Sequence, residues 1–234
     1  DHKPLYRIER SLKREDLELP RQTMSGIAVR CGAEVLLPLY QCLKSFVLSF
    51  DYIFSDDTKM PIQLQNVPEQ RRDDCGSARM WAYGNAVGPR QVVYDFTLNR
   101  GKEGPAAFLA DYRAGYLQAD AYAGYDVIFN DPTSDVIEVG CNAHARRKFH
   151  EVLDKSPKLA SEFLGMYRAL YAIERRADEL ELDSTERLGL RREQSAPIVS
   201  AMYDRIEQVL PVLRPTDAVL AGIKYVTNQR EALT

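Results

Sequence analysis

The stretch YLQADAYAGY, residues 116–125, decides the fold predicted for this chain of 234 residues. Its first four residues read as a short apolar strand, and Asp120 follows at the end of that strand, before small and turn-forming residues. The stretch YIFSDDT, residues 52–58, repeats this arrangement, with Asp56 after the predicted strand Tyr52–Ser55. Each carboxylate is therefore expected to be held rigidly at a strand end while its oxygens face solvent.

Two such carboxylates on neighbouring strands could share divalent metal ions, the arrangement used to cut and rejoin phosphodiesters. The alternative is that Asp57 and Asp120 only cap helices or open turns, as Asp often does. Spacing alone favours this alternative. The surrounding sequence favours the metal site.

Three segments carry a resemblance to a known family: SDDT (55–58), LQADAYAGY (117–125) and CNAHARRKF (141–149). In this order they resemble the insertion sequence 66 family of bacterial transposases. The resemblance runs from about Thr23 to Thr234 and includes Trp81, NRG at 99–101 and NQREALT at 228–234. It implies a ribonuclease-H-like catalytic domain with an Asp-Asp-Glu metal triad.

Position by position, Asp56 resembles the first acid of that triad and Asp120 the second. The resemblance therefore implies that both are catalytic ligands of Mg²⁺ or Mn²⁺. It places the third acid in an Asn-rich segment beyond Thr234, so we expect this chain to lack one ligand and to perform little or no strand transfer. Asn142 stands where the family usually has Trp, which indicates a divergent copy.

The order of predicted elements is strand, strand, strand, helix, strand, helix, strand, which predicts an α/β fold with a ribonuclease-H-like mixed sheet. In such a sheet the first and fourth strands are adjacent, which would bring Asp56 and Asp120 together. We expect three regions: an N-terminal helical segment (1–50), the catalytic core (51–155) and a helical insertion (156–234).

Within the core, strands over 80–86 and 91–98 flank Gly88-Pro89, which reads as a hairpin turn. A polar loop is expected over 65–78, and a helix opens at Gly104-Pro105. Trp81 is expected in the core. A last strand is expected over 136–141.

In the N-terminal segment, Arg21 and Thr23 precede a helix and resemble the recognition-helix end of a helix-turn-helix motif. Both are candidate DNA-binding residues. A plain connecting pair of helices is an equally good interpretation, because short helix pairs are common.

The last region shows three apolar stripes at helical spacing, which we interpret as packing faces. They are Phe163, Tyr167, Leu170 and Ala177; Ile198, Met202, Ile206 and Val209; and Val219, Ile223 and Val226.

The net charge of −3 and the pI of about 5.7 argue mildly against a nucleic-acid partner. Phosphate binding depends more on local potential, however, and the basic residues are clustered. We assign DNA-backbone contacts to Arg146, Arg147 and Lys148, and to His144 beside them. An ordinary helix-start or core histidine explains His144 equally well. The resemblance further implies a homo-oligomer on insertion-element DNA, with accessory proteins of the same element as further partners.

Other classes of protein are disfavoured. No apolar run approaches the length of a membrane span, because Pro38, Gln41 and Lys44 interrupt the stretch 35–50, and the charged start is no secretory signal. We therefore expect a cytoplasmic protein with no membrane partner. The four cysteines follow no disulfide or zinc-ribbon spacing, and Cys141-x-x-His144 supplies only half a zinc site.

Two alternative functions stay open. One is a catalytically dead DNA-binding remnant of a transposase. The other is a hydrolase in which Asp56 and Asp120 act as an acid/base pair on a glycoside, without metal.

Overall fold

A computed structural model describes residues 3–63, 75–85 and 87–234, which form two compact units, Asp1–Gly115 and Tyr116–Thr234. The elements combine a five-stranded mixed sheet with many helices, so the predicted mixed α/β class is confirmed. The predicted domain boundaries remain predictions.

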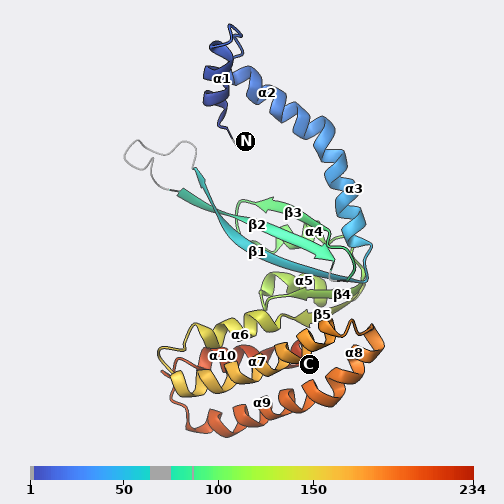
Figure 1. Cartoon of the computed structure of the whole chain (residues 1–234), viewed down its shortest axis with the longest axis vertical. Coiled ribbons are helices and arrows are strands. Elements are labelled where there is room, and N and C mark those ends of the chain that lie inside the picture. Colours follow the sequence, from blue (N-terminus) through green and yellow to red (C-terminus); the bar gives the residue numbers. More distant parts are fainter. Residues whose placement is uncertain (1–2, 64–74, 86) are drawn as a thin grey trace. The chain divides into compact units, whose positions relative to one another are not determined.

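The first unit begins with α1 (Leu5–Lys13) and a long helical rod (Figure 1). The rod consists of α2 (Arg21–Cys31), the π-helical turn η1 (Gly32–Leu36) and α3 (Leu37–Leu48). The wider turn precedes Pro38, which lacks an N–H donor and is tolerated in the first turn of α3.

Because the rod continues through Pro38, the expectation that no run approaches the length of a membrane span is wrong. Arg21–Leu48 forms 28 helical residues that are long and apolar enough to cross a bilayer by length and composition alone.

The sheet of this unit is built by β1 (Tyr52–Gln63), β2 (Cys75–Asn85) and β3 (Val92–Thr97), which pair in antiparallel fashion. β1 is three times the predicted length, so Asp56 lies inside the strand, opposite Ala82, and not at its end. The predicted polar loop ends too late, since Cys75–Ala78 belong to β2. Residues 65–74 of that loop lie outside the described residues. In the long hairpin, the polar residues after Ser55 form main-chain hydrogen bonds with the partner strand. A search for apolar runs cannot detect a strand extension of this kind.

The hairpin turn predicted at Gly88-Pro89 is confirmed between β2 and β3. Gly88 has φ +82°, a conformation that favours glycine. The buried Asn85 side chain closes the turn: its amide donates to the Val87 and Pro89 carbonyls and its oxygen accepts from the Gln91 N–H at 2.7 Å.

Alternation along β1 and β2 separates the two faces of this sheet. Trp81 and Tyr83 are fully buried on one face, where Tyr83 stacks on Phe108 of α4 (Glu103–Phe108) with ring centroids 3.7 Å apart. The indole N–H of Trp81 donates to Thr97 Oγ1 at 2.8 Å. The predicted core position of Trp81 is therefore confirmed.

The second unit contains most of β4 (Ala114–Ala119), followed by η3 (Ala123–Tyr125), α5 (Asp126–Phe129) and β5 (Asp135–Gly140). Asp120 follows β4 directly, as predicted. The strands form one sheet in the order β3-β2-β1-β4-β5, in which the first and fourth strands are neighbours, as expected.

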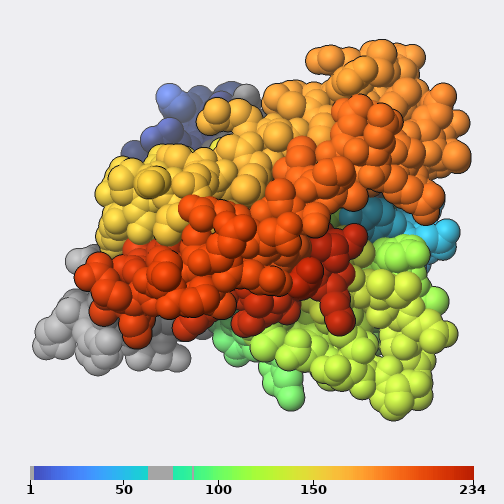
Figure 2. Space-filling model, turned by 90° about the horizontal axis from the view of Figure 1, so that it is seen from below, coloured from blue at the N-terminus to red at the C-terminus, as the bar shows by residue number. Residues whose placement is uncertain are grey.

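Helices make up the rest of this unit, and in Figure 2 the atoms of residues 150–234, yellow to red, form one continuous body. They are α6 (Asn142–His150), α7 (Pro157–Glu179), α8 (Ser184–Leu190), η4 (Arg191–Ser195), α9 (Ala196–Val209), η5 (Leu210–Val212), α10 (Leu220–Asn228) and α11 (Arg230–Leu233). Phe149 lies at the centre of their core and stacks on Phe163, with ring centroids 4.6 Å apart. Most residues of the three predicted stripes belong to this core, including Tyr167, Ile206 and Ile223, so the packing interpretation is confirmed.

Candidate functional site

Asp56 and Asp57 are consecutive in β1, so their side chains point to opposite faces of the sheet. Asp57 shares a face with Trp81, its partner in β2, whereas Asp56 is exposed and shares the other face with Ala82. The Asp57 N–H donates to Asp56 Oδ1 at 2.8 Å, which fixes one carboxylate oxygen against the strand. Because side chains alternate along the strand, the exposed acid of the two is Asp56, the one that the family resemblance indicated.

The Asp57 carboxylate is almost fully buried, with 3% of its side chain exposed, and two arginines neutralise it. Arg79 Nη1 lies 2.7 Å from Oδ2, and Arg100 Nη2 lies 2.7 Å from Oδ1. Arg100 belongs to the NRG segment that contributed to the resemblance. Sequence reasoning missed this ion-pair triad, because two of its members are 43 residues apart.

Asp120 lies half-buried at the end of β4, where its Oδ1 accepts the Tyr122 N–H at 3.2 Å. This is an Asx-turn, so the turn-opening alternative for Asp120 describes part of its local geometry. Tyr225 of α10 interacts electrostatically with Asp120, Cys141 and Glu138, and burial chiefly raises the pKa of its phenol to about 12. Burial also raises the pKa of Glu138, with a contribution from Asp126. The sequence analysis identified neither Tyr225 nor Glu138.

Cys141 and His144 form a pair at the start of α6. Burial alone raises the pKa of the Cys141 thiol, but hydrogen bonds to the side chain and backbone of His144 outweigh it, so the pKa is lowered. His144 is half-buried there, which fits the helix-start interpretation of this residue. Its role in DNA binding stays a prediction.

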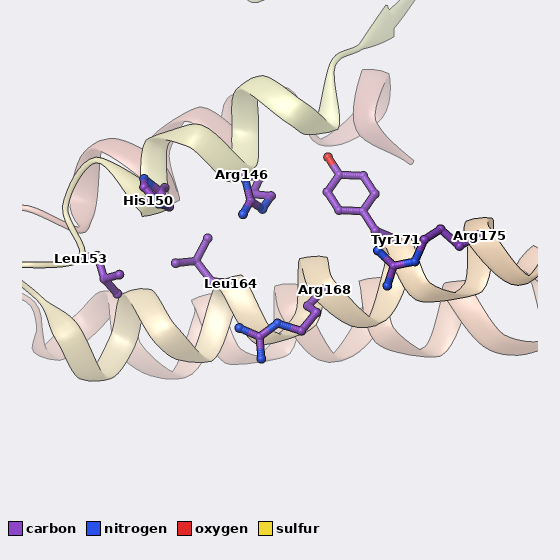
Figure 3. Close-up of a pocket in the computed structure, with 7 residues that line it drawn as sticks. All are labelled: Arg146, His150, Leu153, Leu164, Arg168, Tyr171 and Arg175. Atoms are coloured by element: carbon purple, nitrogen blue, oxygen red, sulfur yellow. The ribbon is translucent and has the colours of Figure 1, made fainter.

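The three basic residues that follow His144 have different environments. Arg146 and Arg147 are exposed and line a groove between α6 and α7 (Figure 3 shows Arg146). Lys148 is half-buried, and its Nζ lies 6.0 Å from the centre of the Tyr225 ring. The exposure of Arg146 and Arg147 is therefore compatible with the prediction that they contact the DNA backbone.

In the first unit, Arg21 and Thr23 occupy the exposed first turn of α2. Arg21 Nε lies 3.0 Å from Glu9 Oε2 of α1, and the Arg21 N–H also donates to Glu9 at 3.2 Å. These contacts join α1 to the start of α2. Both interpretations of this helix pair remain open.

The donor chemistry of the two candidate metal ligands suits a hard cation, because both are carboxylates. Among the described residues, no group of three or more His, Cys, Asp or Glu side chains is arranged to hold a metal ion. Asp56 and Asp120 each supply a carboxylate, the ligand type that such a cation prefers.

Comparison with known proteins identifies the family. The family model described as "Transposase IS66 family" matches residues 1–234, and this chain belongs to that family. Curated relatives from Sinorhizobium fredii (strain NBRC 101917 / NGR234) include the uncharacterized proteins y4hP, 30% identical over 98% of this chain, and y4qI, 27% identical over 100%. The chain covers 44% of the length of each of these two relatives. No solved structure matches significantly.

Proposed function

We propose that this chain is part of a DNA transposase of the Asp-Asp-Glu type, which cuts insertion-element ends and joins them to target DNA. Membership of the IS66 transposase family across residues 1–234 is the observation that carries this proposal. The strand order and the helices that follow β5 support a ribonuclease-H-like core with a helical insertion. The same membership favours a cytoplasmic protein that works as a homo-oligomer on DNA, with accessory proteins of the same element.

Asp56 and Asp120 are the proposed catalytic acids. Bound Mg²⁺ or Mn²⁺ would activate the attacking water or 3′-hydroxyl and neutralise charge on the leaving oxygen. The protein's own contribution is to hold these carboxylates still: β1 pairing fixes Asp56, and the turn to Tyr122 fixes Asp120. Asp57 acts differently, because its charge is already matched by Arg79 and Arg100.

The proposed DNA contacts are those of the sequence analysis. Arg146 and Arg147 offer exposed guanidinium groups, which bind phosphate oxygens well. His144 and Lys148 would support them from half-buried positions, and Arg21 and Thr23 would form a separate contact in the N-terminal helices.

A strand-transfer assay tests the catalytic assignment. The protein that contains this chain is incubated with labelled element-end DNA and Mg²⁺, and Asp56→Asn and Asp120→Asn are compared with Asp154→Asn, an exposed loop position. Loss of a metal ligand removes several kcal/mol of transition-state stabilisation, so each active-site variant should lose at least ~100-fold in joining. The Asp154 variant should join normally.

Joining that persists in Asp56→Asn or Asp120→Asn would refute their assignment as metal ligands. If the unsubstituted protein binds element ends but joins none with Mg²⁺ or Mn²⁺, the protein is a DNA-binding remnant. Activity on a glycoside without metal would replace the proposal altogether.

A further inference from the structure

The second unit carries a groove between α6 and α7 that is lined mainly by basic side chains. Its cavity has a volume of about 510 Å³, and a second hollow of about 290 Å³ shares Arg146, His150 and Tyr171 with it. Figure 3 shows Arg146 and His150 on α6 and Arg168, Tyr171 and Arg175 on α7. The leucines Leu153 and Leu164 complete the lining.

Helical spacing produces this convergence. Arg146 and His150 are four residues apart on α6, and Arg168, Tyr171 and Arg175 follow at intervals of three and four on α7. Residues at these intervals lie on one side of a helix. Phe149 faces the core on another side of α6 and stacks on Phe163 of α7, which holds the two helices together.

Within the described residues, no acidic side chain pairs with the arginines of the groove. Arg146, Arg147, Arg168 and Arg175 are all exposed, and no ion pair joins any of them to an acid in the described part of the chain. Other arginines of this unit are ion-paired: Arg187 and Arg191 bind Glu174, and Arg205 binds Glu162. A groove lined by one sign of charge concentrates the field and attracts polyanions.

The groove is linked electrostatically to the surroundings of one proposed catalytic acid. Tyr171 interacts electrostatically with Cys141 and Arg146, and Tyr225 interacts with Cys141 and Asp120. The phenol of Tyr171 is protonated at neutral pH, as tyrosines ordinarily are, and can donate a hydrogen bond to a phosphate oxygen. Cys141, the residue that precedes α6, thus interacts with Tyr171 of the groove and with Tyr225, which also interacts with Asp120.

We propose that this groove is a track for the nucleic-acid backbone, in which Arg168 and Arg175 of α7 and Arg146 of α6 bind phosphates of one DNA strand. The inference rests on the proposed function and extends it to helix α7. Seven residues of helix place Arg168 and Arg175 ~10.5 Å apart along the axis. Along the axis of a DNA duplex the phosphates of one strand advance ~3.4 Å each, so with α7 along that axis the two arginines would contact phosphates about three apart.

A DNA-binding measurement tests the track. Fluorescence anisotropy reports the affinity of this chain for a labelled DNA duplex at salt concentrations between 50 and 200 mM. The triple variant Arg146→Gln, Arg168→Gln, Arg175→Gln is compared with a matched control, Lys158→Gln, Arg176→Gln, Arg192→Gln. The control removes the same charge from exposed positions that do not line the groove.

Each lost phosphate contact lowers the slope of log affinity against log salt by about 0.9. The slope of the groove variant should therefore be smaller by ~2.7. The fourfold increase in salt should then lower the DNA affinity of the unsubstituted chain by a factor about 40 times larger than that of the variant. The control should keep the original slope. Urea unfolding should be unchanged in both, because the substituted side chains are exposed.

An equal loss of slope in both variants would overturn the track, since net charge alone would then explain binding. So would an unchanged slope in the groove variant, no DNA binding by the unsubstituted chain, or displacement of DNA by millimolar inorganic phosphate at constant ionic strength. These outcomes are separate from the strand-transfer assay: Asp56→Asn and Asp120→Asn should bind DNA with the original slope. The catalytic proposal can therefore fail while the track stands, and the reverse.

Discussion

Asp57 and Arg100 form an ion pair of 2.7 Å across 43 residues of sequence, and only 3% of the Asp57 side chain is exposed. Arg79 approaches the other carboxylate oxygen at the same distance. The neighbouring Asp56 is exposed on the opposite face of the same strand. Two adjacent acids of one motif thus have different roles, one in stability and one proposed for catalysis.

Substitution of Asp57 should damage the fold far more than substitution of Asp56. Asp57→Ala leaves two partly buried guanidinium groups without their shared partner, and breaking a buried pair costs about 3–5 kcal/mol. Asp56→Ala, at an exposed position, should change the free energy of unfolding by ~0.5 kcal/mol or less. Urea unfolding of the two variants provides the comparison, and equal midpoints would contradict it.

Two glycines of the second unit should respond to alanine in opposite directions. A Cβ at Gly222 would lie 2.9 Å from a ring carbon of the fully buried Phe149, so Gly222→Ala should destabilise by about 1–3 kcal/mol through overpacking. A Cβ at Gly165 of α7 meets nothing within 4 Å. Gly165→Ala should stabilise by ~0.5–1 kcal/mol, because alanine loses less backbone entropy in a helix. Thermal unfolding of both variants checks the signs.

Glu174 should contribute stability that depends on pH. The hydrogen bond from Arg191 chiefly, and then the Arg191 charge and the contacts of Arg187, hold the pKa of Glu174 below its ordinary 4.5, against the opposing effect of burial. A lowered pKa in the folded state stabilises the protein above pH 4.5, and this contribution is lost as pH falls through the folded-state pKa.

Glu174→Gln should therefore cost about 1 kcal/mol at pH 7 and progressively less as pH falls below 4.5. The exposed neighbour Glu179→Gln serves as the control and should show little effect at either pH. A Glu174→Gln deficit that stays constant between pH 3 and pH 7 would show that the ion pairs are not its cause. Urea unfolding across this pH range measures it.

Cys141 should react as a thiolate at a lower pH than an ordinary thiol. Burial opposes ionisation, but hydrogen bonding to His144 outweighs it and lowers the pKa of Cys141 below 9.0. Alkylation of Cys141, followed by mass spectrometry as a function of pH, should show a midpoint below 9.0. In His144→Ala the midpoint should rise, because burial is then unopposed by that side chain. An unchanged midpoint would mean that His144 does not stabilise the thiolate.

Several features of the fold could be predicted from the sequence because they depend on local pattern. The apolar stripes of the last region follow helical spacing, and residues such as Phe163 and Ile223 are buried where that spacing places them. The glycine at position 88 indicated the hairpin turn, and the apolar run before Asp120 indicated β4. Membership of the transposase family was also predicted from the sequence motifs.

Other features depend on partners that are distant in sequence. The extension of β1 through Asp57 requires β2 as a pairing strand and Arg79 and Arg100 as counter-ions. The helical spacing of Arg168 and Arg175 was present in the sequence, but a stripe of arginines usually marks a solvated face.

The sequence by itself determined the family, the order of strands and helices, and the identity of the two acids proposed for catalysis, because these follow from local patterns and sequence motifs. Only the tertiary structure decided that Asp57 is neutralised, that Asp56 is exposed, and that arginines of α6 and α7 line one groove. The reason is physical: pairing across β1 and β2 and packing around Phe149 set the direction in which each charged side chain points.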